Sequence, residues 1–264
     1  MRSSTSPGGG SAGLDDKSVL LRTAHLLDSF DAGHPVLPLC ELVRRSDMPK
    51  STVHRLAEQL VQLGWLERAP FGYRIGVRMF EMGGLADRYR VLRDRALPRL
   101  QELSTRTGLV VQLGVLDNLD VVYLERILVR GLNLPTREGG RMPAHCTGLG
   151  KVLLAFGSEA EVDVLLNAEL PPLTPHTMHN PQDLVRQLRR VRELGYANDR
   201  EEAVMGLECL AVPLRGSGRA IAAISVCGRR NQTSVDEHLA EIRRTASAIW
   251  ADMFHQSGAA TVGH

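Results

Sequence analysis

Aromatic side chains, paired cysteines and long apolar runs are all scarce in this 264-residue sequence. Phe, Trp and Tyr make up only 4% of the residues, which argues against a stacking platform for single-stranded nucleic acid. No C-x-x-C spacing occurs, so we expect neither a zinc site nor a disulfide framework but reduced, packed thiols at Cys40, Cys146, Cys209 and Cys227. No apolar run approaches the roughly 20 residues that span a bilayer, and the first residues lack the apolar core of a signal peptide. We therefore expect a cytoplasmic protein without a membrane partner.

Sequence motifs for catalysis, nucleotide binding and metal binding are also missing. The dipeptide Gly150-Lys151 lacks the upstream glycine and the following Ser or Thr of a P-loop. The run Gly216-Ser217-Gly218 is not the G-x-S-x-G of a nucleophile elbow, and it predicts a hairpin turn instead. His176 and His179 have no acidic or cysteine partner nearby in the sequence, which favours a polar loop over a metal site. We therefore predict no catalytic residue, no metal and no cofactor.

The formal charge of +2 is unevenly distributed along the chain. Between Lys17 and Arg78, nine Lys and Arg stand against six Asp and Glu, whereas Met79 to His264 carries twenty-two of each. A surplus of three positive charges is small, and affinity for duplex DNA grows with the number of phosphates that are neutralised. One copy of this basic segment is therefore expected to bind DNA weakly, and a symmetric pair more strongly.

The basic segment has the pattern of a helix-turn-helix. Leu39, Leu42 and Val43 form the apolar face of a short helix, and only Ser46-Asp47-Met48 separates it from a second one. Proline at the start of the second helix suits a first turn, and Gly64 is expected to end it. The apolar residues of this second helix recur at helical spacing and are predicted to be buried, namely Val53, Leu56, Ala57, Leu60 and Leu63.

The opposite face of the second helix would present polar side chains to phosphates and base edges in a major groove about 12 Å wide. We predict DNA contacts by Lys50, Ser51, Thr52, His54 and Arg55. Segments 65–68 and 73–75 are predicted to form a hairpin that adds Arg68 and Arg74 to these contacts. A merely solvated polar face is the commoner interpretation of an isolated helix, and the short turn and the hairpin favour DNA binding here.

The rest of the chain alternates between helical and strand patterns. The first helix is expected over 18–31, with Leu20, Ala24 and Leu27 facing inward. Further helices are predicted at 77–89, 92–107, 146–156, 158–167, 181–195 and 235–255, and strands at 109–116, 120–127, 209–214 and 220–227. Two adjacent glycines at 83–84 weaken the helix that contains them and suggest a hinge. Antiparallel strands with helices on one side predict an α+β domain.

Five segments carry a specific family resemblance. LPLCEL at 37–42, MPKSTVHRL at 48–56, LGWLER at 63–68, RMPAHCTGLGKVLLA at 141–155 and the run 199–213 resemble signatures of the IclR family of bacterial transcriptional regulators. The resemblance implies a mainly α winged helix-turn-helix N-terminal domain joined by a linker helix to an α+β, GAF-like effector domain. The expected boundaries are a disordered tail at 1–16, the DNA-binding domain at 17–76, the linker helix at 77–91, the effector-binding domain at 92–256 and a second disordered tail at 257–264.

Glycines in the run 147–150 are predicted to open a helix whose free backbone N–H groups favour an anion such as a carboxylate. On the residues alone, glycines that permit close helix packing are an equally good interpretation. The resemblance implies an effector pocket lined by Met142, Gly148, Leu149, Asp199, Leu207, Cys209, Ser225 and Cys227. The two-residue period of strands places Ser225 and Cys227 on one face, and Cys209 and Ala211 likewise. Cys227 departs from the serine expected in many relatives, which alters the expected polarity of the ligand.

The resemblance implies a ligand-responsive regulator that binds a pseudo-palindromic operator as a dimer or as a dimer of dimers. Its expected partners are double-stranded operator DNA, a small-molecule effector that is a carboxylate or a related metabolite, and further copies of the same chain. Two alternatives stay open at this point. One is a thiol-based redox regulator that uses Cys209 and Cys227, and the other is an enzyme with an accessory interaction domain.

Overall fold

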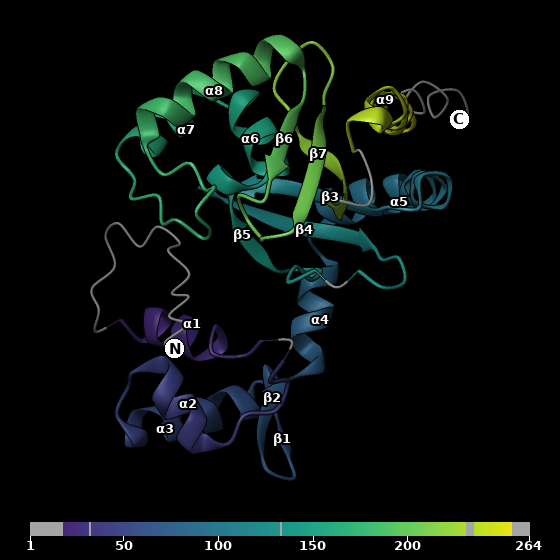
Figure 1. Cartoon of the computed structure of the whole chain (residues 1–264). Helices are drawn as coiled ribbons and strands as arrows, with labels where there is room; N and C mark the ends of the chain where they lie inside the picture. Colours follow the sequence, from purple (N-terminus) through teal and green to yellow (C-terminus); the bar gives the residue numbers. More distant parts are fainter. Residues whose placement is uncertain (1–17, 32, 133, 231–234, 255–264) are drawn as a thin grey trace, which may run out of the picture. The chain divides into compact units, whose positions relative to one another are not determined.

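The computed structural model divides into two compact units, which meet in the sequence between Asp87 and Arg88 (Figure 1). The structure describes residues 18–31, 33–132, 134–230 and 235–254. The tails expected at 1–16 and 257–264 therefore lie outside the described residues. Each unit has its own hydrophobic core, so the two are considered separately below.

The first unit is a winged helix-turn-helix. Its elements are α1 (Val19–Leu27), α2 (Leu39–Ser46), α3 (Lys50–Gln62), β1 (Leu66–Ala69), β2 (Gly72–Ile75) and α4 (Val77–Gly84). Asp47 adopts a left-handed backbone conformation that ends α2, and α3 begins three residues later. The hairpin of β1 and β2 is extended by Leu37, whose backbone exchanges two hydrogen bonds with Tyr73. The predicted turn, second helix and hairpin are therefore all present.

The face of α3 that was expected to be apolar forms the centre of this unit. Val53, Leu56, Ala57 and Leu60 are buried as predicted, but Leu63 is 57% exposed because the helix has already ended at Gln62. Gly64 takes the positive φ of 72° that follows this helix end, a conformation that costs glycine little.

The predicted inward face of α1 is correct only at Leu27, which is half-buried and packs against the core. Leu20 and Ala24 are exposed, and Leu26 is the residue that is completely buried in the core shared with α2 and α3. The helix is rich in leucine on more than one face, so periodicity alone did not select the buried one. Tertiary contacts do: the guanidinium of Arg45 on α2 donates to the carbonyl of Ser29 and pairs with Asp31 just beyond α1.

The helix expected over 77–89 is two helices. α4 ends at the second glycine of the pair, Gly84, and α5 (Asp87–Thr107) starts after two intervening residues. Glycine disfavours helix by about 1 kcal/mol relative to alanine, which accounts for the break. Pro98, by contrast, lies inside a continuous α5 and does not start a new helix.

The second unit is an α+β domain around one antiparallel sheet. After α5 its elements are β3 (Val110–Asp117), β4 (Asp120–Ile127), β5 (Arg141–Pro143), the 3-10 helix η1 (Ala144–Cys146), α6 (Gly148–Ala155), α7 (Glu159–Leu166), α8 (Pro181–Leu194), β6 (Ala197–Arg200), β7 (Leu207–Leu214), β8 (Ala222–Arg229), the 3-10 helix η2 (Val235–His238) and α9 (Leu239–Phe254). The strand order is β5-β4-β3-β8-β7-β6. The two edge strands, β5 and β6, were not predicted, because three or four residues are too short to show a period.

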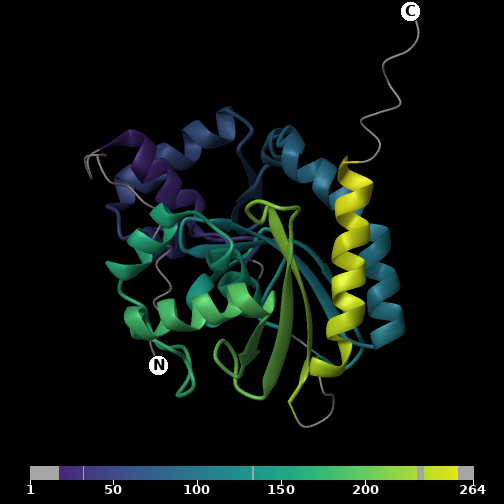
Figure 2. The ribbon, with the colours of Figure 1, turned by 90° about the horizontal axis from the view of Figure 1, so that it is seen from above.

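Helices cover both faces of this sheet, which corrects the expectation that they lie on one side. α5 and α9 run side by side over one face (Figure 2), joined by ion pairs such as Arg99 with Asp252. Their leucines and isoleucines pack on alternate residues of β7, including Leu210 and Val212. The core on the other face is built from α6, α7 and α8 with the intervening small residue Ala211. Because side chains alternate along each strand, one face of the sheet packs against α5 and α9. The other face packs against α6, α7 and α8 and carries the site described below.

The observed orientation of α1 gives a stability prediction. We expect Leu26→Ala to lower the free energy of unfolding of the first unit by about 2–5 kcal/mol, because it leaves a cavity in the core. The matched control Leu20→Ala should change it by less than about 0.5 kcal/mol, because that side chain is 75% exposed. In a Trp250→Phe background Trp65 is the only tryptophan, so its fluorescence during urea titration follows this unit. Equal losses in the two variants would contradict the orientation.

Candidate functional site

The first turn of α3 is open to solvent within its unit. Four of the five residues predicted to contact DNA there are exposed, and Thr52 is half-buried; the exposed residues are Lys50, Ser51, His54 and Arg55. Pro49 sets the backbone before this turn, and the buried side of the same turn is held by Val53. The helix therefore presents its polar amino-terminal end outward while its opposite face is fixed in the core.

The hairpin is joined to the same helix by a carboxylate. Glu58 of α3 accepts a hydrogen bond of 2.7 Å from the Tyr73 hydroxyl and forms an ion pair of 2.6 Å with Arg68. These contacts hold the pKa of Glu58 below its usual value, with the Tyr73 hydrogen bond as the largest cause. Arg74 pairs with Glu67 of the neighbouring strand at 2.8 Å. The two arginines predicted to contact DNA thus both form intramolecular ion pairs, and the pair between Arg68 and Glu58 joins the hairpin to α3.

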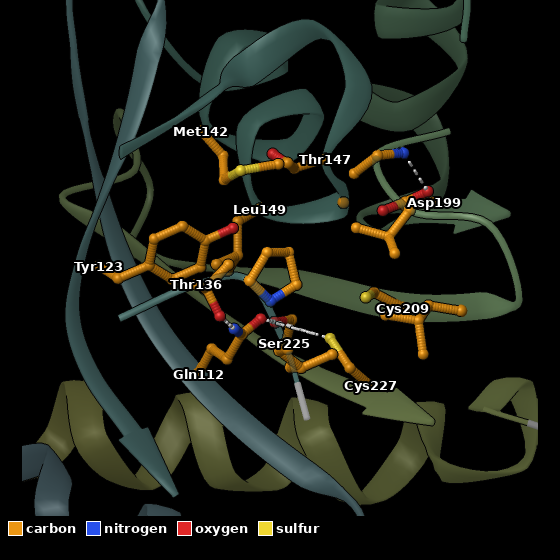
Figure 3. Close-up of a pocket in the computed structure, with 16 residues that line it drawn as sticks. Gln112, Tyr123, Thr136, Met142, Thr147, Leu149, Asp199, Cys209, Ser225 and Cys227 are labelled. Atoms are coloured by element: carbon orange, nitrogen blue, oxygen red, sulfur yellow. Dashed lines mark hydrogen bonds between the residues drawn. The ribbon is translucent and has the colours of Figure 1, made fainter. Parts of the chain in front are cut away.

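A pocket lies in the second unit, between the start of α6 and the face of the sheet that α6 covers (Figure 3). Its cavity volume is about 30 Å³ in this structure, so lining side chains must move apart to admit a small molecule. All eight residues that the resemblance assigned to an effector pocket line this cavity, including Asp199 and both Cys209 and Cys227. Segments separated by more than eighty residues in the sequence therefore meet at this cavity.

Eight further lining residues were not predicted, namely Gln112, Tyr123, Leu134, Pro135, Thr136, Thr147, Ala203 and Val204. One of them carried a signal in the sequence. Gln112 is the single polar side chain inside the apolar run 109–116, and a buried amide in a strand requires partners that apolar neighbours do not supply. The others lie in loops or on β4, where the residue types alone do not distinguish a pocket from an ordinary core.

The amino terminus of α6 forms one end of the pocket. Thr147 caps the helix by accepting a hydrogen bond from the N–H of Gly150 at 3.0 Å. Helix geometry leaves the N–H groups of Gly148 and Leu149 without an acceptor inside the helix. Gly150 has a packing role, because a Cβ there would lie 2.2 Å from the carbonyl oxygen of Ala144. Close packing therefore explains Gly150, whereas Gly148 is the glycine that lines the pocket and could contact a ligand.

Asp199 lies beside this helix end and is almost fully buried. Its carboxylate accepts hydrogen bonds from the backbone N–H groups of Glu202 and Ala203, at 2.8 and 3.4 Å. Burial raises the pKa of Asp199 to about 7, although the nearby ammonium of Lys151 and the Glu202 N–H act in the opposite direction. This carboxyl therefore changes its charge close to neutral pH at one end of the cavity.

An ion pair behind the pocket holds the two segments that form this end. Lys151, on the first turn of α6, has no exposed surface, and its ammonium lies 2.5 Å from the carboxylate of Glu202. The loop that carries Glu202 is also hydrogen-bonded to the chain before α8: the hydroxyls of Thr177 and Thr174 donate to the carbonyls of Glu202 and Glu201, each at 2.6 Å. The Lys151 ammonium therefore holds α6 to the loop after β6 and is not exposed to bind a phosphate, in agreement with the absence of a P-loop motif.

The sheet end of the pocket is a small polar network centred on Gln112. Its side-chain N–H donates to the Thr136 hydroxyl at 2.8 Å, and its carbonyl oxygen accepts from Ser225 at 3.4 Å and from the Cys227 thiol at 3.3 Å. Figure 3 shows these side chains across the cavity from Asp199. Apolar residues such as Leu149 lie between the two polar ends. The arrangement suits a small ligand with a polar group at each end and an apolar middle.

All four cysteines are free thiols, as expected, but they are not all packed. Cys40 is exposed, whereas Cys146 is buried, and burial raises the pKa of its thiol to about 12. Among the described residues, no group of three or more His, Cys, Asp or Glu side chains is placed to hold a metal ion. The helices in the described parts of the chain include none that is both long and apolar enough to span a membrane.

Comparison with known proteins agrees with both halves of this architecture. Residues 19–70 match the IclR helix-turn-helix domain, and residues 88–251 match the family described as bacterial transcriptional regulator IclR C-terminal. The chain is 34% identical over 227 residues to the HTH-type transcriptional regulator XynR of Escherichia coli (strain K12), a match that covers 84% of this chain and 90% of that protein. It is also 34% identical to the HTH-type transcriptional regulator KdgR of the same organism over 247 residues, covering 90% and 94%.

A solved structure extends the comparison to the fold. The IclR homolog from Microbacterium hydrocarbonoxydans, crystallised in complex with 4-hydroxybenzoate, is 31% identical to this chain with a TM-score of 0.79, covering 89% of this chain and 99% of that one. The winged helix-turn-helix and the GAF-like α+β domain are therefore shared by sequence and by structure. The chain belongs to the IclR family of bacterial transcriptional regulators.

Proposed function

We propose that this regulator binds a pseudo-palindromic operator as a symmetric dimer or dimer of dimers, and that a small organic acid in the α6 pocket changes its operator affinity or activity. The observation that carries the proposal is the convergence of the α6 amino terminus, Asp199 and the Gln112 network on one cavity. The named relatives are transcriptional regulators, and the chain is accordingly a regulator and not an enzyme. A thermal-shift screen of small organic acids against the full chain tests the ligand class.

The exposed turn of α3 supports direct contact with base edges. Arg55 has a long, freely exposed side chain on this turn, and arginine donates two parallel hydrogen bonds to guanine in the major groove. Lys50, Ser51 and Thr52 precede it at the helix end, where short donors and an ammonium suit phosphate oxygens. Arg68 and Arg74 add positive charge on the hairpin, and each guanidinium keeps donors beyond those used by its carboxylate partner.

Self-association is supported by the apolar surface of α4. No residue of this eight-residue helix is buried, and Val77, Phe80 and Leu85 are all more than 60% exposed. Val77 and Phe80, three residues apart, lie on one side of the helix, and Leu85 follows its last residue. Association through this surface would place two basic units in one complex, which compensates for the small positive charge of each copy. Recognition helices on neighbouring half-sites must lie about 34 Å apart.

The polarity of the cavity supports a carboxylate ligand with a second polar group. A carboxylate at the α6 end would meet the free N–H groups of Gly148 and Leu149 and the positive end of the helix dipole. A hydroxyl or carbonyl at the other end would meet the Gln112 network and Ser225. The relative crystallised with 4-hydroxybenzoate holds a ligand of this class, which makes 4-hydroxybenzoate a suitable first probe. A complete switch between two states requires about 5.5 kcal/mol of differential ligand affinity, and partial responses require less.

For DNA binding we expect Arg55→Ala to weaken operator affinity by about 1–3 kcal/mol if the side chain reads a guanine, because a bidentate contact is lost. Titration of labelled operator fragments at fixed salt measures this change. Arg244→Ala is the matched control, since it removes the same charge from an exposed position on α9 in the other unit. An unchanged footprint and affinity in Arg55→Ala would remove this residue from the interface.

For self-association we expect Phe80→Ser to shift the molar mass in solution toward that of a single chain, because an apolar side chain that is 83% exposed is replaced by a polar one. Light scattering coupled to size exclusion gives the mass across a dilution series. The control Phe71→Ser changes an equally exposed phenylalanine on the hairpin turn and should leave the mass unchanged. A variant Phe80→Ser that associates as tightly as the unmodified chain would show that α4 is not the contact.

For ligand binding we expect a dependence on pH that Asp199 sets. With its pKa near 7, the carboxyl is neutral below that pH and charged above it, so it repels a bound carboxylate only at higher pH. The affinity for 4-hydroxybenzoate should fall by up to about tenfold per pH unit above pH 7, and Asp199→Asn should remove this slope. Calorimetry from pH 6 to pH 8 measures it, with the exposed Asp163→Asn as control. A slope that survives in Asp199→Asn would assign the dependence to another group.

A further inference from the structure

We propose that Cys209 and Cys227 form a redox modification site, in which a hydroperoxide closes a disulfide across the sheet end of the pocket. The inference goes beyond ligand-controlled DNA binding, and the bond it predicts is defined without any organic acid. It is carried by the position of these two thiols on neighbouring strands and by the difference in their access to solvent.

The strand register brings the two residues face to face. Cys209 of β7 is the direct antiparallel partner of Cys227 of β8. Directly opposed residues have Cα atoms about 4.5 or 5.5 Å apart, depending on their place in the hydrogen-bonding pattern, and both distances lie within the 4.4–6.8 Å that a disulfide requires. Figure 3 shows both side chains among the residues that line the pocket. Bond formation therefore requires no change of strand register.

The two thiols differ in accessibility, which suits them to different steps. Cys209 is partly exposed and lines the cavity, so a small oxidant reaches its sulfur from the pocket. Cys227 has no exposed surface, and its thiol donates to the side-chain oxygen of Gln112. Cys209 is therefore the thiol that meets the oxidant, and Cys227 is the resolving thiol beside it.

The reaction consumes one hydroperoxide and two thiols. After loss of its proton to water, the Cys209 sulfur attacks the peroxide oxygen, the O–O bond breaks, and the departing hydroxide takes up a proton to give water. The Cys227 sulfur then attacks the sulfur of the resulting sulfenic acid, an S–S bond forms, and the sulfenic oxygen leaves as a second water after receiving the Cys227 proton. Two electrons pass from the thiols to the peroxide in all, and a dithiol reverses the reaction by exchange.

Closure of the bond changes the end of the pocket that carries the Gln112 network. The Cys227 sulfur can no longer donate to the Gln112 oxygen, so that oxygen keeps only its bond from Ser225. The cross-link also ties β7 to β8 where both strands line the cavity. Oxidation therefore acts on the same cavity as the proposed effector, through a covalent bond that needs no effector to form.

The test is mass spectrometry of the reduced full chain after titration with hydrogen peroxide. Under non-reducing conditions we expect the mass of the chain to fall by about 2 Da, because disulfide formation removes two hydrogen atoms. N-ethylmaleimide should still label Cys40 after denaturation. Proteolysis should yield one peptide pair joined through Cys209 and Cys227, which dithiothreitol separates. Peptide mapping of the unmodified chain gives this result without relying on any variant.

Matched variants separate this pair from the other thiols. Cys209→Ser and Cys227→Ser should each abolish the linked peptide, whereas Cys40→Ser and Cys146→Ser should retain it. Oxidation of Cys40 without a linked Cys209–Cys227 peptide would overturn the proposal, as would linkage of either residue to Cys146 instead. Failure of 4-hydroxybenzoate to bind bears only on the proposed effector, because the linked peptide is measured in its absence.

Discussion

The buried ion pair between Lys151 and Glu202 is the contact on which the ligand pocket depends. Lys151 follows Gly148 by one turn of α6, and Glu202 follows Asp199 by three residues. This ion pair therefore joins the start of α6 to the segment that carries Asp199, and both segments line the same end of the pocket. A charge without exposed surface is costly unless it is paired, and removing one partner commonly costs 3–5 kcal/mol. The start of α6 and the loop after β6 must therefore be ordered together, which fixes the backbone N–H groups relative to the Asp199 carboxyl.

A second carboxylate has a comparable role in the DNA-binding unit. Glu58 lies on the same helix as the predicted base-reading residues, yet it points to the hairpin and holds Tyr73 and Arg68. The recognition helix and the hairpin are consequently positioned as one rigid surface before any DNA is present. In both units, therefore, residues that are not expected to contact DNA or effector, namely Glu58, Lys151 and Glu202, position the residues that are expected to do so.

Much of the fold followed from local patterns, and the parts that did not were decided by contacts between distant segments. The apolar period of α3, the turn before it and the hairpin after it are each encoded within about a dozen residues, and all three were predicted correctly. The buried face of α1, the edge strands β5 and β6 and the second helical layer of the sheet depend on what packs against them. The eight residues assigned by resemblance meet in one pocket, whereas Gln112 and Thr136 become neighbours only through the paired strands and the loop after β4.

The helix α4 has a physical consequence that follows from its lack of buried residues. A helix of eight residues with two glycines at its end is marginal in water, because nucleation is costly and no core contact supports it. In the proposed assembly, covering its apolar side would supply that support, so ordering of the helix and association of the chains would be one equilibrium. In the proposed assembly, the helical content of this segment would therefore rise with protein concentration.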